Sequence, residues 1–151
     1  MYEKIINCRY DIDAIEYSKK ATDRANLFFG KKIVEHRDLL LMNDIKDKYD
    51  VIILDPPAFA KHQSAKYNAL QGYKRINLQA IQQIKKGGII FTFSCSQVVE
   101  KQLFYSTIVS AAILSGRKVK VIHQLSQPPD HPVSAFHPEG EYLKGLVLFV
   151  D

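Results

Sequence analysis

The chain of 151 residues has few cysteines and no long apolar stretch. Its two cysteines, Cys8 and Cys95, are too few for a disulfide framework or a cysteine-based metal site. Its five histidines do not follow metal-ligand spacing, so no metal is predicted. No apolar run approaches the roughly 20 residues that a membrane-spanning helix needs, and the first residues lack the pattern of a signal peptide. These features favour a cytoplasmic protein with no membrane partner.

The composition is that of an ordinary folded domain. Hydrophobic residues make up 46% and charged residues 25% of the chain, close to the globular average. This length suits one domain with its own core, so residues 1–151 are predicted to form a single unit. The net charge of +5 permits contact with nucleic acid phosphates, although many basic domains bind none.

Short apolar runs alternate with segments of helical periodicity, which is typical of an α/β fold with a mostly parallel sheet. The helix expected at 13–29 has Asp13 as a candidate N-cap, and Gly116 suits the end of another helix. The predicted strands are 5–10, 32–36, 50–54, 89–93, 119–125 and 143–150, the helices 13–29, 73–85 and 98–115, and the loops 58–71 and 127–141.

Two of these strands end in reactive side chains. One runs into Asp55-Pro56-Pro57, and the other ends at Ser94-Cys95-Ser96. Open α/β sheets bind ligands at the carboxyl ends of their strands, so a carboxylate and a thiol are predicted to lie side by side there. A thiol in a polar, accessible setting can add to an electron-poor carbon. The alternatives are a structural cysteine and an aspartate that begins a turn.

Further candidates lie around these strand ends. Asp38 could accept from the amine of an adenine, and Asp11 could bind ribose hydroxyls; either could instead be a solvated surface acid. The segment 58–77 mixes cations with aromatic rings, which suits single-stranded RNA, although an ordinary solvated loop has a similar composition. Its cations and rings are Lys61, His62, Lys66, Tyr67, Tyr73, Lys74 and Arg75.

Several segments together resemble the class I S-adenosylmethionine-dependent RNA methyltransferases, in particular the group that makes 5-methylcytosine in large-subunit ribosomal RNA. The resemblance covers about residues 30–151. The segments are Asp-Pro-Pro-Ala-Phe at 55–59, Gly-Tyr-Lys-Arg-Ile-Asn at 72–77, Gly-Gly-Ile-Ile-Phe-Thr-Phe-Ser-Cys-Ser at 87–96, Asp-His-Pro-Val at 130–133 and Pro-Glu-Gly-Glu-Tyr-Leu-Lys-Gly at 138–145.

The resemblance implies a Rossmann-like sheet with an antiparallel C-terminal strand, S-adenosylmethionine as cofactor and ribosomal RNA as partner. It places the catalytic thiol on Cys95 and a carboxylate that contacts cofactor and target base on Asp55. The thiolate would add to carbon 6 of cytosine and so activate carbon 5. The expected cofactor contacts are Asp11, Asp38, Asp55 and Pro56, and the expected RNA contacts are Pro57, Phe59, Lys61, Tyr73 and Lys74.

The chain also departs from this family. The glycine-rich first motif and the N-terminal RNA-binding domain are absent, so the domain is predicted to be partial, with a sheet incomplete at its N-terminal side. Either the missing part lies elsewhere, or the sheet is rearranged, in which case residues 4–8 are expected in the vacated position. Such a chain could bind cofactor poorly alone, or rely on a missing portion or a homodimer. The alternatives are an inactive remnant or RNA-binding partner, and an enzyme that methylates another base position.

Overall fold

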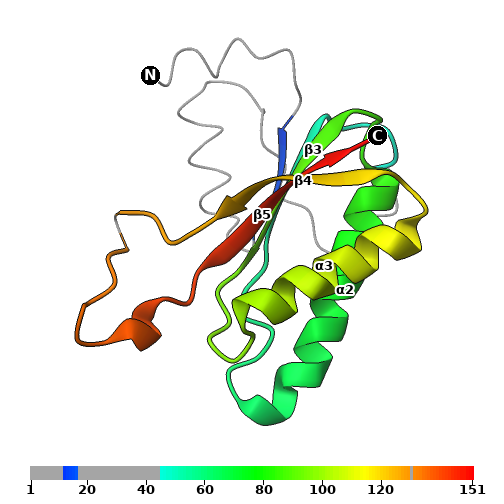
Figure 1. Ribbon diagram of the computed structural model, residues 1–151. Helices are drawn as coiled ribbons and strands as arrows, with labels where there is room; N and C mark the ends of the chain where they lie inside the picture. The colour runs from blue at the N-terminus through cyan, green and yellow to red at the C-terminus, as the bar shows by residue number, and fades with distance from the viewer. Residues whose placement is uncertain (1–11, 17–44, 130) are drawn as a thin grey trace.

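The computed structural model describes residues 12–16, 45–129 and 131–151, the first of these by backbone alone. In this part of the chain, five strands form one sheet in the order β1-β2-β3-β5-β4, with helices packed beside it (Figure 1). The elements are β1 (Ile12–Glu16), β2 (Val51–Asp55), η2 (Gln63–Ala65), α2 (Lys66–Gln83), β3 (Gly88–Ser94), α3 (Lys101–Ser115), β4 (Val119–Leu125), η3 (Pro138–Gly140) and β5 (Lys144–Val150).

The strand directions confirm the predicted fold class. Strands β1, β2 and β3 pair in parallel, whereas β5 is antiparallel to both of its neighbours, β3 and β4. Strand β2 is an uninterrupted apolar run before Asp55, as a buried parallel strand requires. Pro56 follows at once, and its ring nitrogen cannot donate to a ladder. The sheet is therefore mostly parallel with one antiparallel strand near the C-terminus.

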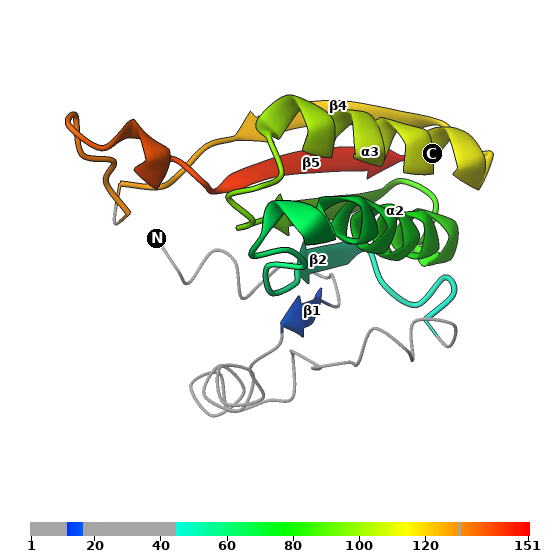
Figure 2. The same cartoon turned by 90° about the horizontal axis from the view of Figure 1, so that it is seen from below.

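Helices α2 and α3 lie side by side on one face of the sheet, as Figure 2 shows. The inner face of β3 is fully buried at alternate positions, as expected for a strand covered by helices. Tyr73 of α2 and Phe104 of α3 are the largest fully buried side chains and meet edge to face at 5.3 Å between ring centroids. The core therefore lies between the two helices and the sheet, directly behind the strand ends.

The N-terminal part corrects two predictions. Residues 12–16 form a strand rather than the start of the helix predicted at 13–29, so Asp13 is not an N-cap. The position beside β2 is taken by β1, not by residues 4–8. Pairing of Ile12–Glu16 with the five residues of β2 overrides the local helical periodicity. The strands predicted at 5–10 and 32–36 lie outside the described residues.

Helix α2 begins at Lys66, so residues 66–71 of the predicted loop 58–71 are helical instead. The buried stripe of this helix extends back to Ala69, one turn before Tyr73, and supports the additional turn. Position 72 lies within this helix and suits a glycine, because a side chain there would meet the ring of Phe59 at 3.0 Å. The glycine thus allows a close approach of Phe59 to α2.

Later elements agree more closely with their predicted bounds. Helix α3 begins three residues later than predicted and ends as predicted before Gly116, which has the left-handed conformation (φ 70°) of a C-cap. The segment between β4 and β5 extends away from the sheet in Figure 1 and contains only the short η3. No helix within 45–129 and 131–151 is long and apolar enough to cross a bilayer.

Candidate active site

The carboxyl ends of β2 and β3 bring the two predicted catalytic residues to one edge of the sheet. Asp55 is the last residue of β2 and is exposed, while Cys95 directly follows β3 and is a half-buried free thiol. The two strands are adjacent and parallel, with Leu54 opposite Thr92. Partial burial of its carboxyl raises the pKa of Asp55 above the ordinary value of 3.8.

The phenol of Tyr73 reaches this edge from the helix layer. Burial is the main reason why the pKa of Tyr73 is raised; hydrogen bonds with Ser94 and the Phe59 backbone lower it, and the charges of Cys95 and Asp55 raise it again. The carboxylate and the thiol are thus both close enough to act on one hydroxyl. Asp55, Tyr73 and Cys95 therefore form one electrostatic cluster.

Tyr73 is not an RNA contact, which corrects the prediction made for it. Its side chain has no exposed surface, and its ring lies 4.7 Å from Phe59 and 5.3 Å from Phe104 between centroids. A ring enclosed in this way cannot stack on a base. Composition could not predict this, because a cation-rich segment with aromatic rings has the same composition whether the rings face water or the core.

The two serines beside Cys95 hold the turn in place. Ser94 Oγ donates to the Tyr73 hydroxyl at 2.9 Å and accepts from the backbone N–H of Ser96 at 3.3 Å. Ser96 Oγ donates to the carbonyl of Ala60 at 2.7 Å, which connects the cysteine turn to the segment after Pro56. Both serines are fully buried. The polar surroundings predicted for Cys95 are therefore an internal framework, not an accessible surface.

Lys144 completes the cluster, and the sequence analysis did not single it out. It lies opposite Ser94 in the β3–β5 ladder and is only 6% exposed. Its ammonium donates to the carbonyl of Ser96 at 2.6 Å and to that of Tyr142 at 3.0 Å. Burial lowers the pKa of Lys144, and the charge of Cys95 acts in the opposite direction. The available signal in the sequence was a lysine at the start of an otherwise apolar strand.

The other predicted site residues are spread more widely. Pro56 is buried, while Pro57 and Lys61 are exposed and Phe59 is half-buried. Lys74 is half-buried in a groove between α2 and α3, where it lies with Tyr67, Ser106 and other helix residues. Asp11 and Asp38 lie outside the described residues. Around the cluster, the described part of the site thus offers Pro57, Phe59 and Lys61 for contact with a substrate.

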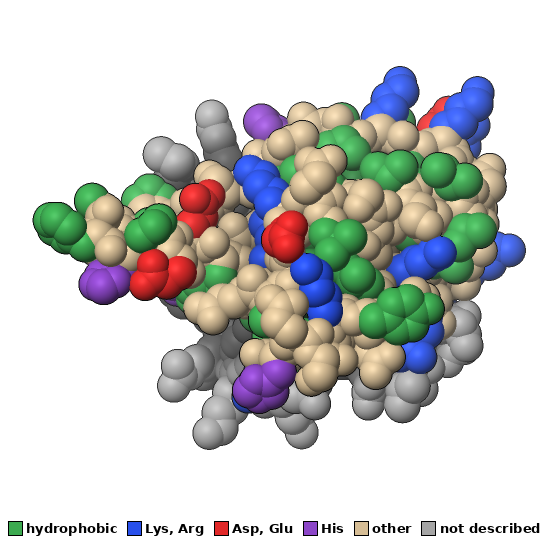
Figure 3. Space-filling model, turned by 60° about the horizontal axis from the view of Figure 1, so that its bottom comes forward, with side chains coloured by type: hydrophobic (Ala, Val, Ile, Leu, Met, Phe, Trp, Pro, Cys, Tyr) green, Lys and Arg blue, Asp and Glu red, His purple; other side chains and the backbone are tan. Residues whose placement is uncertain are grey.

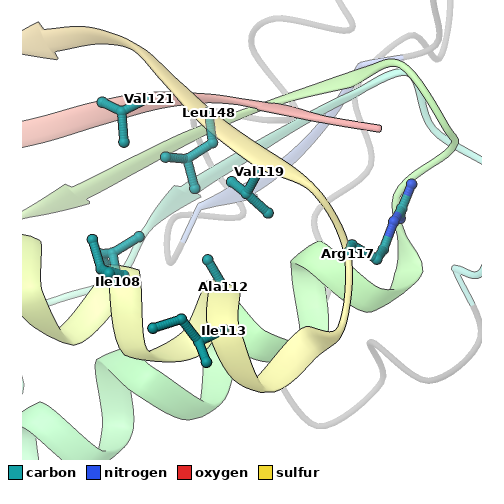
Figure 4. A pocket seen from close by; sticks show the side chains of 8 residues that line it. Ile108, Ala112, Ile113, Arg117, Val119, Val121 and Leu148 are labelled. Carbon is teal, nitrogen blue, oxygen red and sulfur yellow. The ribbon is translucent and has the colours of Figure 1, made fainter.

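Charged and apolar side chains are distributed unevenly over the surface. Figure 3 shows Lys and Arg side chains over the helical part, whereas the protruding segment carries Asp, Glu, His and hydrophobic side chains. A second, apolar groove runs between α3 and β4 and is lined by Ile108, Val119 and Val121 among others (Figure 4). Within the described residues, no group of three or more His, Cys, Asp or Glu side chains is arranged to hold a metal.

The sequence is similar to curated ribosomal RNA large subunit methyltransferase I proteins. It is 35% identical over 150 residues to that of Aeromonas hydrophila, with 97% of this chain and 38% of the relative covered. For the Citrobacter koseri protein the identity is 40% over 142 residues, with 91% of this chain and 36% of the relative covered. For Escherichia coli it is 50% over 107 residues, covering 71% and 27%. The chain thus spans well under half the length of these relatives. No family model matches it.

Solved structures share the fold. The crystal structure of SMU.776 complexed with SAH superimposes with a TM-score of 0.66 at 17% identity, covering 92% of this chain and 38% of that one. NSun6 from Pyrococcus horikoshii with SFG superimposes with a TM-score of 0.58 at 15% identity, covering 97% of this chain and 49% of that one. A methyltransferase from Pyrococcus furiosus gives 0.51 at 13% identity, covering 98% and 78%. The chain therefore has the Rossmann-like fold of class I methyltransferases.

Proposed function

We propose that this chain, a relative of ribosomal RNA large subunit methyltransferase I, is the catalytic portion of an enzyme that methylates carbon 5 of cytosine in ribosomal RNA. Its methyl donor is S-adenosylmethionine, and its place of action is the cytoplasm. The observation that carries the proposal is the joint position of Asp55 and Cys95 at one sheet edge, at the carboxyl ends of the adjacent parallel strands β2 and β3. Methylation of an exocyclic amine needs no thiol, so the cysteine favours carbon methylation.

The described part of the site, around Asp55 and Pro56, is compatible with the methyl donor. The donor carries a positive sulfonium and an amino group, and the exposed carboxylate of Asp55 at the ligand-binding edge suits such charges. Pro56 fixes the chain behind this carboxylate. Asp38 and Asp11 would hold the adenine and ribose. When bound, S-adenosylmethionine supplies an electrophilic methyl group for carbon 5 of the base.

Cys95 would carry the covalent part of the reaction. The thiolate attacks carbon 6 of cytosine, a bond from Sγ to carbon 6 forms, and the electron pair of the 5,6 double bond moves to carbon 5. Once carbon 5 is methylated, a base removes its proton. The 5,6 double bond then re-forms while the bond to Sγ breaks, and Cys95 leaves as a thiolate.

Asp55 would orient the base during these steps. Its carboxyl can accept from the exocyclic amine of cytosine or share a proton with ring nitrogen 3. The raised pKa of Asp55 helps the second role, because a carboxyl that keeps its proton more readily can donate it as charge develops on the ring. Pro57, Phe59 and Lys61 lie within six residues after Asp55 and would contact the target nucleotide. Further RNA contacts would come from a portion outside this chain or from a second copy.

Trapping on RNA that contains 5-fluorocytosine tests the reaction. Fluorine cannot leave carbon 5 as a proton does, so a covalent complex through Cys95 is expected to persist in the presence of S-adenosylmethionine. Cys95→Ala should abolish this complex, while the control Cys8→Ala should keep it. A cofactor-bound chain that forms no complex with RNA it methylates would point to another base position.

Calorimetry with S-adenosylmethionine separates the enzyme from an inactive remnant. We expect the chain to bind poorly alone, and to bind with micromolar affinity that weakens in Asp55→Ala once it is joined to the remaining length of a relative. A chain that binds neither the cofactor nor its demethylated product, even when joined to the remaining length of a relative, would contradict the enzymatic proposal and leave an RNA-binding role.

A further inference from the structure

The protruding segment, residues 126–143, carries an aromatic ring that the fold leaves exposed. The segment joins the end of β4 to the start of β5 and extends away from the sheet in Figure 1. Phe136 is 90% exposed, and Val133, three residues earlier, is 39% exposed. A phenylalanine that faces water almost completely gains little from the folding of its own chain. Its ring therefore remains available for burial against a partner.

Gln127 holds the base of the protruding segment in one conformation. Its side-chain N–H groups donate to the carbonyls of His131 at 2.8 Å and Gly140 at 3.0 Å. Its side-chain carbonyl accepts from the backbone N–H groups of Tyr142 at 3.1 Å and Leu143 at 3.2 Å. Hydrogen bonds across the segment reduce the entropy that is lost when it binds. The exposed ring is thus carried on a pre-ordered support.

The groove between α3 and β4 offers an apolar site of matching size. Its volume is about 210 Å³, and its lining is apolar except for Arg117 (Figure 4). An apolar cavity of about 150 Å³ is enough to hold a benzene ring. Two of the lining residues on α3, Val109 and Ile113, are 48% and 75% exposed. Helix α3 is thus apolar on the side that faces β4 as well as on its buried side, as expected of a helix that is covered on both.

Strand β4 is the outer strand of the sheet and connects the groove with the protruding segment. The groove lies at its start, beside Val119 and Val121, and the segment leaves from its end at Leu125. Within the described residues β4 pairs only with β5, and it is exposed or half-buried along its whole length. A two-fold axis that sets two such strands antiparallel brings the segment of each copy to the groove of the other. The β4–β5 ladder is irregular between Val121 and His123, so side chains rather than a continuous ladder would make the contact.

Charges at the two ends of β4 are complementary in this arrangement. The protruding segment contains no Lys or Arg and carries Glu139 and Glu141, while Lys118 and Lys120 lie at the start of the strand. All four of these residues are exposed. RNA suits the protruding segment less well, because its phosphates would meet carboxylates with no lysine or arginine beside them. A second copy of the chain therefore fits both the apolar and the charged side chains.

We propose that this chain forms a two-fold dimer in which the Phe136 ring of each copy inserts into the α3–β4 groove of the other. The carboxylates of the protruding segment then lie near the lysines at the start of the partner's β4. This interface accounts for exposed apolar side chains that the proposed methyl transfer does not use, and it does not depend on that reaction.

Sedimentation equilibrium of the chain, without cofactor or RNA, measures the association. The parent is expected to form a dimer at micromolar concentration. Phe136→Ser removes two buried rings from each dimer, so the dissociation constant should rise about 100-fold or more. Ile113→Asn places an amide in both grooves and should weaken the dimer to a similar extent. Both residues are exposed in the single chain, so both variants should fold, which circular dichroism checks.

A mixture of the two variants tests the contact directly. Phe136→Ser keeps an intact groove and Ile113→Asn keeps an intact protruding segment, so a mixed dimer regains one of its two contacts. Its dissociation constant should be about tenfold lower than that of either variant alone. Tyr67→Ser changes an exposed aromatic residue that lines the other groove, between α2 and α3. It is the matched control and should leave the dimer unchanged.

The outcomes are distinct. A parent chain that stays monomeric at about 100 µM would overturn the inference. A dimer that both variants leave intact, or a mixture that associates no more tightly than its components, would do the same. Weaker binding of a single-stranded oligoribonucleotide by Phe136→Ser, with no change in oligomeric state, would assign the protruding segment to RNA instead. Failure of the proposed function is seen separately, as methyl transfer that survives Cys95→Ala.

Discussion

The hydrogen bond from Ser96 to Ala60 predicts a large cost for a small substitution. Ser96→Ala removes one oxygen atom from a fully buried position and takes away a 2.7 Å donor to the Ala60 carbonyl. A net loss of about 1 kcal/mol is usual for such a bond, and the buried carbonyl left without this donor raises the cost to about 2 kcal/mol. Urea unfolding should show a lower midpoint, by about 1 M for a chain of this size, with an unchanged slope.

Ser106→Ala is the matched control. That hydroxyl also donates to a backbone carbonyl, that of Leu103 at 3.0 Å, but it lies on the exposed side of α3. Water can replace it, so the expected change is within about 0.5 kcal/mol. Equal free energies of unfolding for the two alanine variants would refute the idea that Ser96 ties the cysteine turn to the segment after Asp55.

Two further predictions follow from the same region. Because burial raises the pKa of Asp55, the folded state binds its proton more tightly, and the stability from this group is full below pH 3.8 and is lost as pH rises through the folded pKa. Asp55→Asn should therefore unfold at the same or a higher temperature than the parent at pH 7, and any such gain should vanish in acid. A clearly lower unfolding temperature at pH 7 contradicts this. A side chain at Gly145 would lie 2.6 Å from the ring of Phe93, so Gly145→Ala should destabilise by about 1–3 kcal/mol in urea unfolding, and adding Phe93→Leu should recover part of the loss; a double variant no more stable than Gly145→Ala would speak against this contact.

Local patterns were sufficient to predict the strands that carry the site. The runs before Asp55 and Cys95 are short, apolar and bounded by prolines or glycines, so their type and ends follow from the sequence. Because β2 and β3 are adjacent and parallel, their carboxyl ends lie at the same edge of the sheet. The resemblance to methyltransferases supplied the direction of β5, and the structure confirms it.

The remaining features depend on contacts between distant residues. Lys144 reaches the turn that carries Cys95 only through the antiparallel register of β5 against β3, which no local pattern reveals. Tyr73 turns inward because it lies on the buried face of α2, one turn after Ala69, and packs against Phe104 of α3. Residues 12–16 pair with β2 although their spacing suits a helix equally well. In each case contacts between distant residues decide between two conformations that the local sequence allows equally.

The order of strands in the sheet has a consequence for synthesis on the ribosome. Strand β5 lies between β3 and β4 but follows both in the chain. When residues up to Leu125 have emerged, β4 lacks its partner strand β5, and Ser96 lacks the lysine that donates to its carbonyl in the finished fold. A nascent or prematurely ended chain would thus expose unpaired β4 to aggregation. It would also leave the turn around Cys95 without the hydrogen bond from Lys144 to Ser96, so that assembly of the sheet and completion of this turn become a single event.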